Sequence, residues 1–139
     1  MTLIHKALWH IEPHLQQPLS LPELAQQCAV SVYHLSRTFR SATGYAPMTY
    51  LRARRLSLAA NRLIADNADI LDIALATQYG SHEAFTRAFA GYFGHLPSSV
   101  RAAGCIQHLD LMEPINMDKS RLVDLQPHEI KERQAFRVM

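Results

Sequence analysis

An internal repeat is the feature of this sequence that most restricts its fold. The segment Ser81–Gly94 repeats the segment Ser31–Gly44, and each closing glycine is followed by a proline three positions on. The aligned pairs include Leu35 with Phe85, Arg37 with Arg87, Phe39 with Phe89 and, with a slip of one residue, Leu24-Ala25 with Ile73-Ala74. A repeat outweighs local propensity, because both copies must form the same supersecondary unit. We therefore predict an all-α fold with two helix-turn-helix units, at about residues 20–44 and 69–94.

Each repeated segment has the signals of a helix with one buried face. Ser31 can accept hydrogen bonds from free backbone N–H groups at the helix start, and Gly44 suits a left-handed stop. At about 100° per residue, Val32, Leu35 and Phe39 share one face. We predict that this face is buried.

The opposite face of the first repeated segment is polar and aromatic. It carries Tyr33, Ser36, Arg37 and Arg40. An aromatic ring, a hydroxyl and two guanidinium groups suit the base edges and phosphates of a DNA groove. An ordinary amphipathic helix with a solvated charged face is the alternative for this segment alone. The recurrence of the pattern in the second copy favours DNA binding, since the second helix of such a unit enters the major groove.

Length and composition limit the other classes of protein. The chain has 139 residues, 48% of them hydrophobic, which allows one helical domain with a buried core and a short remainder. No apolar run approaches the roughly 20 residues of a membrane span, and the first residues lack the layout of a secretory signal. Two cysteines, Cys28 and Cys105, are too few for a disulfide scaffold or a zinc site of their own. We therefore expect a cytoplasmic protein without membrane association, metal or cofactor.

Positive charge is concentrated in the first half of the chain, although the net charge is only +2. No acidic residue lies between Glu23 and Asp66. The arginines of this stretch are Arg37, Arg40, Arg52, Arg54, Arg55 and Arg62. A local basic patch favours a polyanionic partner over a merely solvated surface.

Hydrophobic spacing predicts a first helix over residues 3–15. Ile4, Leu8, Ile11 and Leu15 fall on one stripe, and Pro13 is expected to end or bend the helix early. A capping box of Ser20 with Glu23 then starts the first helix of the first unit.

The longest predicted helix covers residues 47–65, which contain no glycine and no internal proline. Its apolar stripe is Leu56, Ala59, Ala60, Leu63 and Ile64. About 18 residues span roughly 27 Å, near the roughly 34 Å between successive major-groove faces of DNA. A loop over 66–69 follows, with Asp69 placed to cap a helix from Ile70 to about Thr77. The second turn is predicted at 79–80.

Residues 3–104 resemble the DNA-binding domain of the AraC/XylS family of bacterial transcription regulators. The matching motifs are Leu24-Ala25, Ser31-x-x-x-Leu35-x-Arg37-x-Phe39, Gly44-x-x-Pro47-x-x-Tyr50-Leu51, Arg55-Leu56-x-x-Ala59, Ile70-x-x-Ile73-Ala74, Phe85-x-Arg87-x-Phe89 and Gly94-x-x-Pro97-x-x-Val100-Arg101. The resemblance implies a two-lobed, seven-helix domain over residues 1–104. This chain departs from the family in having Gln78-Tyr79 where Gly-Phe is usual, with Gly80 following.

The resemblance also implies which residues contact DNA. The base-reading positions are Tyr33, Ser36 and Arg37 in the first unit and His82, Glu83, Thr86 and Arg87 in the second. Arg40 is assigned to DNA as a phosphate contact, and further phosphate contacts are expected at Ser31, Ser81, Arg52 and Arg101.

The remaining residues, 105–139, break the helical pattern. Two short strands are expected at 122–125 and 135–138. The stretch resembles the opening of the gyrase-inhibitor-like effector-binding domain fused to some members of the family. It is either a linker or the truncated start of such a domain, and an effector ligand is expected only where that domain is complete.

The function expected from these features is sequence-specific binding to double-stranded DNA by a transcription regulator. The resemblance adds activation and a contact with RNA polymerase. An enzyme is not expected, because no nucleophile–base–acid cluster is present. The alternative is a protein-interaction module, or truncated paralogue, that contacts polymerase or an effector partner without reading DNA.

Overall fold

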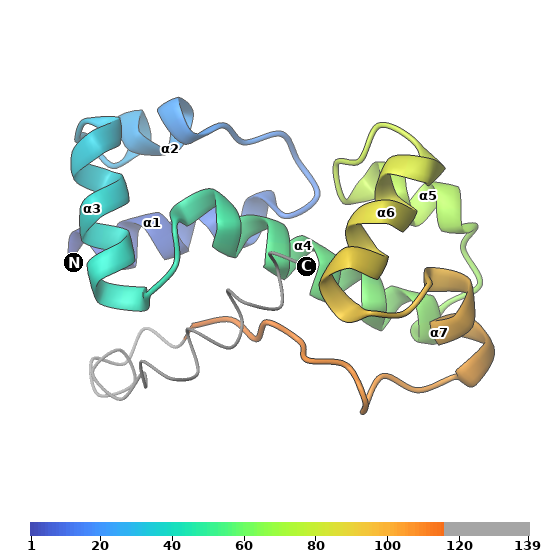
Figure 1. The fold of residues 1–139 in the computed structure, drawn as a ribbon. Helices are drawn as coiled ribbons and strands as arrows, with labels where there is room; N and C mark the ends of the chain where they lie inside the picture. The colour runs from blue at the N-terminus through green and yellow to red at the C-terminus, as the bar shows by residue number, and fades with distance from the viewer. Residues whose placement is uncertain (116–139) are drawn as a thin grey trace.

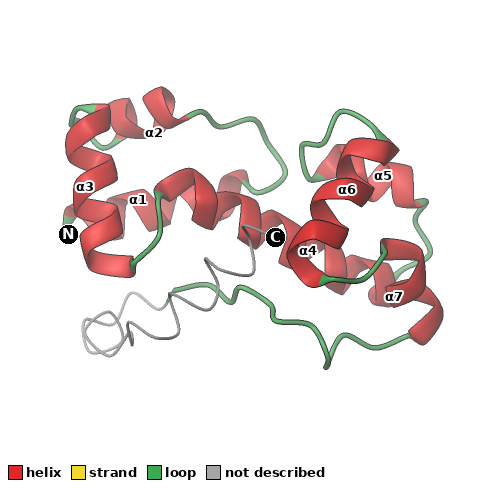
Figure 2. Cartoon of the chain, in the orientation of Figure 1, coloured by secondary structure: helices red, strands yellow, loops and turns green. Residues whose placement is uncertain are grey.

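A computed structural model describes residues 1–115, and every regular element in this range is helical (Figures 1 and 2). The elements are α1 (Leu3–Ile11), the 3-10 turn η1 (Glu12–His14), α2 (Leu21–Gln27), α3 (Val32–Thr43), α4 (Pro47–Ala65), α5 (Ile70–Ala76), α6 (His82–Phe93) and α7 (Pro97–Ala103). The predicted all-α, two-unit fold is confirmed. The strands predicted at 122–125 and 135–138 lie outside the described residues. No helix of residues 1–115 is long and apolar enough to cross a membrane.

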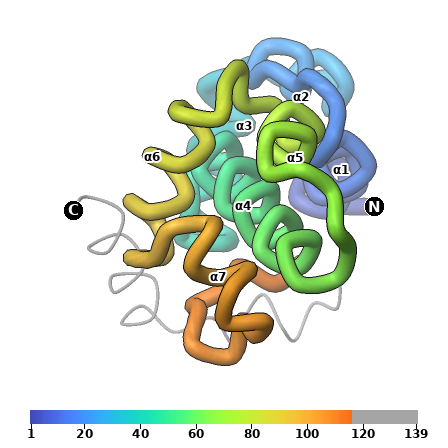
Figure 3. Tube along the Cα trace, turned by 90° about the vertical axis from the view of Figure 1, so that its right-hand side faces the viewer, coloured from blue at the N-terminus to red at the C-terminus, as the bar shows by residue number. Residues whose placement is uncertain are grey.

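The long helix α4 connects two lobes (Figure 1). One lobe contains α1 and the first unit, α2–α3, while the other contains the second unit, α5–α6, and α7. In Figure 3, α4 lies at the centre with α5, α6 and α7 around it. The observed bounds of α4 are those predicted from the sequence.

The predicted helix starts and stops are largely confirmed. Ser31 Oγ accepts from the His34 N–H at 3.0 Å, and Ser81 Oγ accepts from the Ala84 N–H at 3.1 Å. The capping box of Ser20 and Glu23 is present, and Gly44 and Gly94 end α3 and α6 with φ of 85° and 76°. The two units therefore begin and end their second helices in the same way.

Two predicted caps and ends differ from the observed ones. The first helix ends at Ile11, and Pro13 lies in η1, which confirms the early end but shortens the predicted helix over 3–15. Asp69 occupies the N-cap position of α5 without a side-chain capping bond. Within the preceding loop it is Asp66 that accepts from a backbone N–H, that of Ala68 at 2.9 Å, and this bond lowers the pKa of the Asp66 carboxyl.

The second helix of each unit is anchored by two buried residues one turn apart. Leu35 and Phe39 of α3 and their counterparts Phe85 and Phe89 of α6 are all 0% exposed. Val32 was predicted to join them but is 40% exposed, because the first residue of α3 projects beyond the core. The predicted burial of Ile64 near the end of α4 is wrong for a similar reason, since it is 39% exposed.

The turns of the two units have the same backbone conformation. In the first, Ala29 adopts φ of 60°, and the Val30 N–H donates to the Ala25 carbonyl at 3.1 Å. In the second, Gln78 adopts φ of 74°, and the Tyr79 N–H donates to the Ala74 carbonyl at 2.9 Å. Gly80 is thus the residue that produces the slip in the repeat, and Gln78 occupies the left-handed position for which glycine is better suited.

Gln78→Gly is expected to raise the free energy of unfolding by about 0.5–1 kcal/mol. A side chain in the left-handed region costs roughly 1–2 kcal/mol, part of which is offset by the greater backbone entropy of unfolded glycine. Gly80→Ala is the control, because Gly80 does not have positive φ and an added Cβ would meet nothing within 4 Å. Chemical denaturation measures the change. A Gln78→Gly variant less stable than the parent would contradict the claim that the left-handed conformation at this position destabilises the parent chain.

Two arginines hold in place, by hydrogen bonds to backbone carbonyl groups, the segments that precede the two units. Arg55 of α4 donates to the carbonyl groups of His14, Leu15 and Gln17, at 2.7–3.2 Å, just before α2. Burial lowers the pKa of its guanidinium. These bonds satisfy backbone acceptors that a turn would otherwise leave to water.

Arg101 of α7 does the same for the segment before α5. Its guanidinium donates to the carbonyl groups of Leu63, Asp66 and Ala68, at 2.6–3.2 Å. The phosphate contact that the sequence predicts for Arg101 stays a prediction, but the nitrogen atoms Nε, Nη1 and Nη2 each already donate one hydrogen bond within the protein.

Arg101→Ala is expected to lower the free energy of unfolding by about 1–2 kcal/mol, because it leaves three carbonyl groups to rebind water. Arg52→Ala is the control, since Arg52 is exposed and its side chain makes no hydrogen bond within the described residues; we expect a change within about 0.5 kcal/mol. Equal thermal stability of the two variants would show that the hydrogen bonds of Arg101 to the segment before α5 do not stabilise the fold.

Residues 105–115, which we call the return segment, pass back along α4 from the second lobe toward α1 (Figure 1). The Met112 N–H donates to Ser57 Oγ at 2.8 Å, and Arg54 Nη1 donates to the Met112 carbonyl at 2.8 Å. Leu109 and Met112 are buried. The packed structure therefore continues beyond residue 104, while the predicted division into domains at that residue stays a prediction.

Candidate nucleic-acid interface

The exposed face of α3 contains the four residues predicted from the first repeat. Tyr33, Arg37 and Arg40 are exposed, and Ser36 is half-buried beside them. Arg37 Nη1 donates to Tyr33 Oη at 3.2 Å, and its guanidinium carbon lies 5.5 Å from the centre of the Tyr33 ring. This pair orders two side chains that would otherwise be free on the surface.

A hollow of about 460 Å³ follows the same face of α3. It is lined by Tyr33, His34, Arg37, Thr38, Ser41 and Ala42. The lining is polar and basic, without a carboxylate, and so suits an anionic or hydrogen-bonding surface. His34 and Thr38 were not singled out from the sequence, although they are four residues apart, and His34 is three residues from Arg37, which makes each pair neighbours on the helix surface.

The face of α6 has the same plan with different side chains. His82, Glu83 and Arg87 are exposed and Thr86 is half-buried, so the structure brings all four predicted residues onto one side. Thr86 Oγ1 lies 3.4 Å from His82 Nδ1. Glu83 is in the first turn, where a carboxylate is favoured by the helix dipole.

A second hollow, of about 190 Å³, lies between α4 and α6. It is lined by Arg52, Leu56, Arg87, Ala88, Gly91 and Tyr92. Arg52 and Arg87 therefore face one space from two helices, with no acidic residue in the lining. Neither arginine is bound to a protein acceptor within residues 1–115.

The basic patch is smaller than the sequence predicts. Arg54 is bonded to Glu12, Arg55 to backbone carbonyl groups, and Arg62 to Asp66 at 3.3 Å. These three arginines already have partners within the protein, and the guanidinium groups left for a partner molecule on this stretch are those of residues 37, 40 and 52. Acceptors far away in the sequence, such as Glu12, determine which arginines remain free. Counting charges along the chain does not reveal these acceptors.

The predicted serine contacts are compatible with their capping role. Ser31 and Ser81 are exposed, and each uses its oxygen as an acceptor for the helix. The hydroxyl hydrogen of each serine remains a donor.

Cys28 and the neighbouring pair His10 and His14 have structural surroundings within the described residues. Cys28 is buried, and burial raises the pKa of its thiol, as expected for a small core residue. His14 Nδ1 lies 2.7 Å from the His10 carbonyl oxygen, within the same helical turn. Among residues 1–115, no group of three or more His, Cys, Asp or Glu side chains could hold a metal.

Two capped units on a connecting helix define a helix-turn-helix protein. The family model described as a helix-turn-helix domain matches residues 24–103. The HTH-type transcriptional activator AarP of Providencia stuartii is 36% identical over 114 residues, which cover 81% of this chain and 84% of AarP. The chain belongs to the AraC/XylS family, through its helix-turn-helix DNA-binding domain.

Other relatives are longer than this chain. The right origin-binding protein of Escherichia coli K12 is 43% identical over 99 residues, or 71% of this chain and 34% of that protein. The transcriptional regulator Rob of Salmonella typhimurium is 38% identical over 115 residues, or 83% of this chain and 40% of Rob. The matched part of this chain thus corresponds to less than half of the length of each of these two relatives.

Solved structures have the same fold. An AraC-type transcriptional regulator from Chromobacterium violaceum superposes with a TM-score of 0.70 at 27% identity, covering 76% of this chain and 94% of that one. The DNA-binding domain of AdpA, solved in complex with a target DNA, superposes with a TM-score of 0.64 at 30% identity, covering 73% and 90%.

Proposed function

We propose that this chain is a sequence-specific regulator of transcription that binds double-stranded DNA, with α3 and α6 in two successive major-groove segments. The observation that carries the proposal is the equivalence of the two exposed faces. In each unit the apolar side of the second helix is buried, while an arginine at the same position, Arg37 or Arg87, faces solvent. The AdpA domain, solved with a target DNA, supports it.

The side chains of α3 are assigned to base recognition and positioning. Arg37 can donate two hydrogen bonds to guanine O6 and N7, and its hydrogen bond to Tyr33 restrains its guanidinium. Tyr33 can pack on a thymine methyl group, and Ser36 can bond either base of a pair. Arg40, a turn further along, is placed for a phosphate, which positions the helix without specifying sequence.

The side chains of α6 allow a different base preference. Glu83 can accept from cytosine N4, a contact that discriminates bases without adding charge attraction. His82 and Thr86 offer further hydrogen bonds, and Arg87 can reach a guanine or a phosphate. Two units with different side chains suit two different half-sites.

The spacing of the units is compatible with one face of a DNA duplex. Helix α4 has 19 residues and is roughly 28 Å long. In Figure 1, α3 and α6 both descend from the top of the view, at the two ends of this helix. Successive major-groove segments are roughly 34 Å apart, so modest bending of the DNA would bring both within reach.

Arg52→Ala is expected to weaken binding to all duplexes alike and to reduce the salt dependence of the binding constant by about one unit of log–log slope. The reason is that Arg52 and Arg87 line one hollow that fits a phosphate between the two groove segments. Arg62→Ala is a control of equal charge change, because Arg62 is paired with Asp66. Titrations at several salt concentrations that give both variants the same slope would contradict the phosphate contact.

The proposal also covers the direction of regulation, the protein partners and the location in the cell. The relative AarP is described as an activator, and this supports activation, with a contact to RNA polymerase. We place the protein in the cytoplasm, without an enzymatic activity, and assign the DNA-binding domain to residues 1–104. An effector ligand for residues 105–139 requires a complete further domain.

Equilibrium binding to a mixed-sequence duplex at two salt concentrations tests whether DNA is the partner at all. We expect binding that weakens steeply with salt. Absence of binding at low salt by a folded chain would favour the alternative, a module that contacts other proteins without reading DNA.

A further inference from the structure

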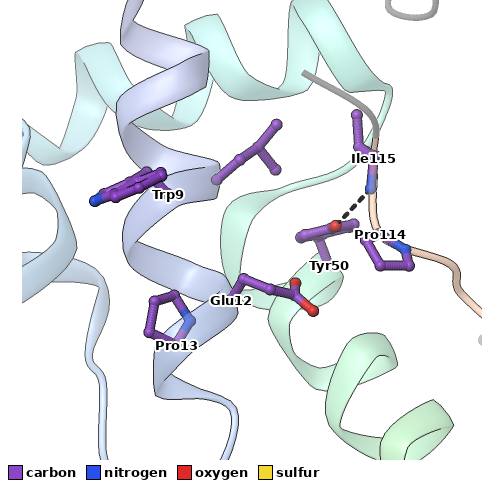
Figure 4. A pocket seen from close by; sticks show the side chains of 7 residues that line it. Trp9, Glu12, Pro13, Tyr50, Pro114 and Ile115 are labelled. Carbon is purple, nitrogen blue, oxygen red and sulfur yellow. Dashed lines mark hydrogen bonds between the residues drawn. The ribbon is translucent and has the colours of Figure 1, made fainter. Parts of the chain in front are cut away.

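A hollow of about 350 Å³ lies between α1 and the end of the return segment, and it shares no residue with the DNA-binding faces (Figure 4). It is lined by Leu8, Trp9, Glu12, Pro13, Tyr50, Pro114 and Ile115. The volume falls within the range of small-molecule sites, and the lining is mainly apolar and aromatic, as in such sites.

The far wall of the hollow, formed by Tyr50 and Ile115, is held in place by a hydrogen bond within it and by packing against α3. The Ile115 N–H donates to Tyr50 Oη at 2.9 Å, the bond drawn in Figure 4. The Tyr50 ring, only 1% exposed, packs at 5.9 Å between centroids against Phe39 of α3. A ligand would therefore meet a largely preformed surface and would not have to order it.

The near wall is Trp9, which is not part of the hydrophobic core. Trp9 is 65% exposed and falls off the buried stripe of α1, which is formed by Ile4, Leu8 and Ile11. In Figure 4 it lies on the α1 side, opposite Tyr50 and Ile115. An exposed aromatic side chain in a mainly apolar lining suits a flat ligand.

The carboxylate at the hollow is paired with an arginine, and the lining offers no free cationic donor. Glu12 is the one ionisable acid in the lining, and no lining residue is basic. Burial raises the pKa of Tyr50 to about 12, so its hydroxyl stays neutral. The nearest guanidinium, that of Arg54, already donates through Nε and Nη2 to Glu12 and through Nη1 to the Met112 carbonyl.

From these features we propose that the hollow binds a flat, apolar organic cation. The positive charge would be stabilised by the face of Trp9 and by the remaining lone pairs of the Glu12 carboxylate. An anion of the same shape would lose its hydration without gaining a free donor.

Three probes of similar shape and different charge test the proposal on the full chain: N-methylquinolinium, neutral quinoline at mildly alkaline pH, and 1-naphthoate. The chain has one tryptophan, so the indole N–H of Trp9 gives a single resonance to follow. We expect saturable shifts, with the cation binding about 2–30-fold tighter than neutral quinoline, as a cation–π contact predicts, and the anion weakest. No saturable shift with any probe, or an anion bound as tightly as the cation, would overturn the proposal.

A matched pair of variants checks the location by calorimetry. Trp9→Leu removes the ring at an exposed position and keeps an apolar side chain, so it should erase the preference for the cation over quinoline. Leu75→Ala, at an exposed position of α5 in the other lobe, should leave the affinity unchanged. Unchanged affinity of Trp9→Leu for N-methylquinolinium would show that the probe binds elsewhere and would refute the site.

Discussion

Arg37→Ala is expected to weaken binding to specific DNA by about 1–3 kcal/mol, roughly 5–150-fold, and to relax the preference at one base position. Arg37 is exposed on α3 and is oriented by Tyr33, so its loss removes a bidentate donor that is already ordered before binding. Binding sites selected from a random duplex library report both effects, as affinity and as a change in one column of the site logo.

Arg40→Ala provides the comparison for Arg37→Ala. It removes the same charge from the same helix, but from a position assigned to phosphate, so affinity should fall while the logo stays the same. An unchanged logo for Arg37→Ala would remove Arg37 from the base-reading residues.

Phe89→Ala is expected to lower the free energy of unfolding by about 3–5 kcal/mol. Phe89 is fully buried, and its ring lies 5.5 Å from that of Phe85 and 4.8 Å from that of Phe93, between centroids. Truncation leaves a cavity at the centre of the second lobe, and rigid aromatic neighbours relax poorly into such a space.

The control for Phe89→Ala is Leu75→Ala, which removes a large apolar side chain that is 49% exposed, and should cost less than about 1 kcal/mol. Denaturation followed by circular dichroism measures both variants. A loss below about 1 kcal/mol for Phe89→Ala would mean that α6 does not depend on this anchor.

The helices were predictable because their signals are local. A capping serine, a glycine stop and buried residues one turn apart are all encoded within one segment, and the repeat supplied each signal twice. The bounds of α4 followed from Pro47 at its start and the polar residues after Ala65. The exposure of Val32 and Ile64 was not predictable, because periodicity gives the direction in which a side chain points and does not show whether neighbouring elements cover it.

Long-range contacts were beyond the sequence patterns. The arginine-rich stretch indicated a polyanion-binding surface, yet Arg54 and Arg55 bind groups about forty positions away. The left-handed conformations of Ala29 and Gln78 were equally hidden, since neither residue type signals one. The candidate DNA-contacting residues of α3, by contrast, follow from helical spacing, whereas those of α6 follow from the family resemblance; their contacts with bases stay predictions.

Selection of bound fragments from a random duplex library, followed by sequencing, tests the central claim that two units in one chain read DNA together. The account predicts a logo with two different short half-sites about one helical turn apart. Arg87→Ala should alter only the half-site bound by α6. A single half-site, or two that vary freely in spacing, would contradict joint reading by α3 and α6 across α4.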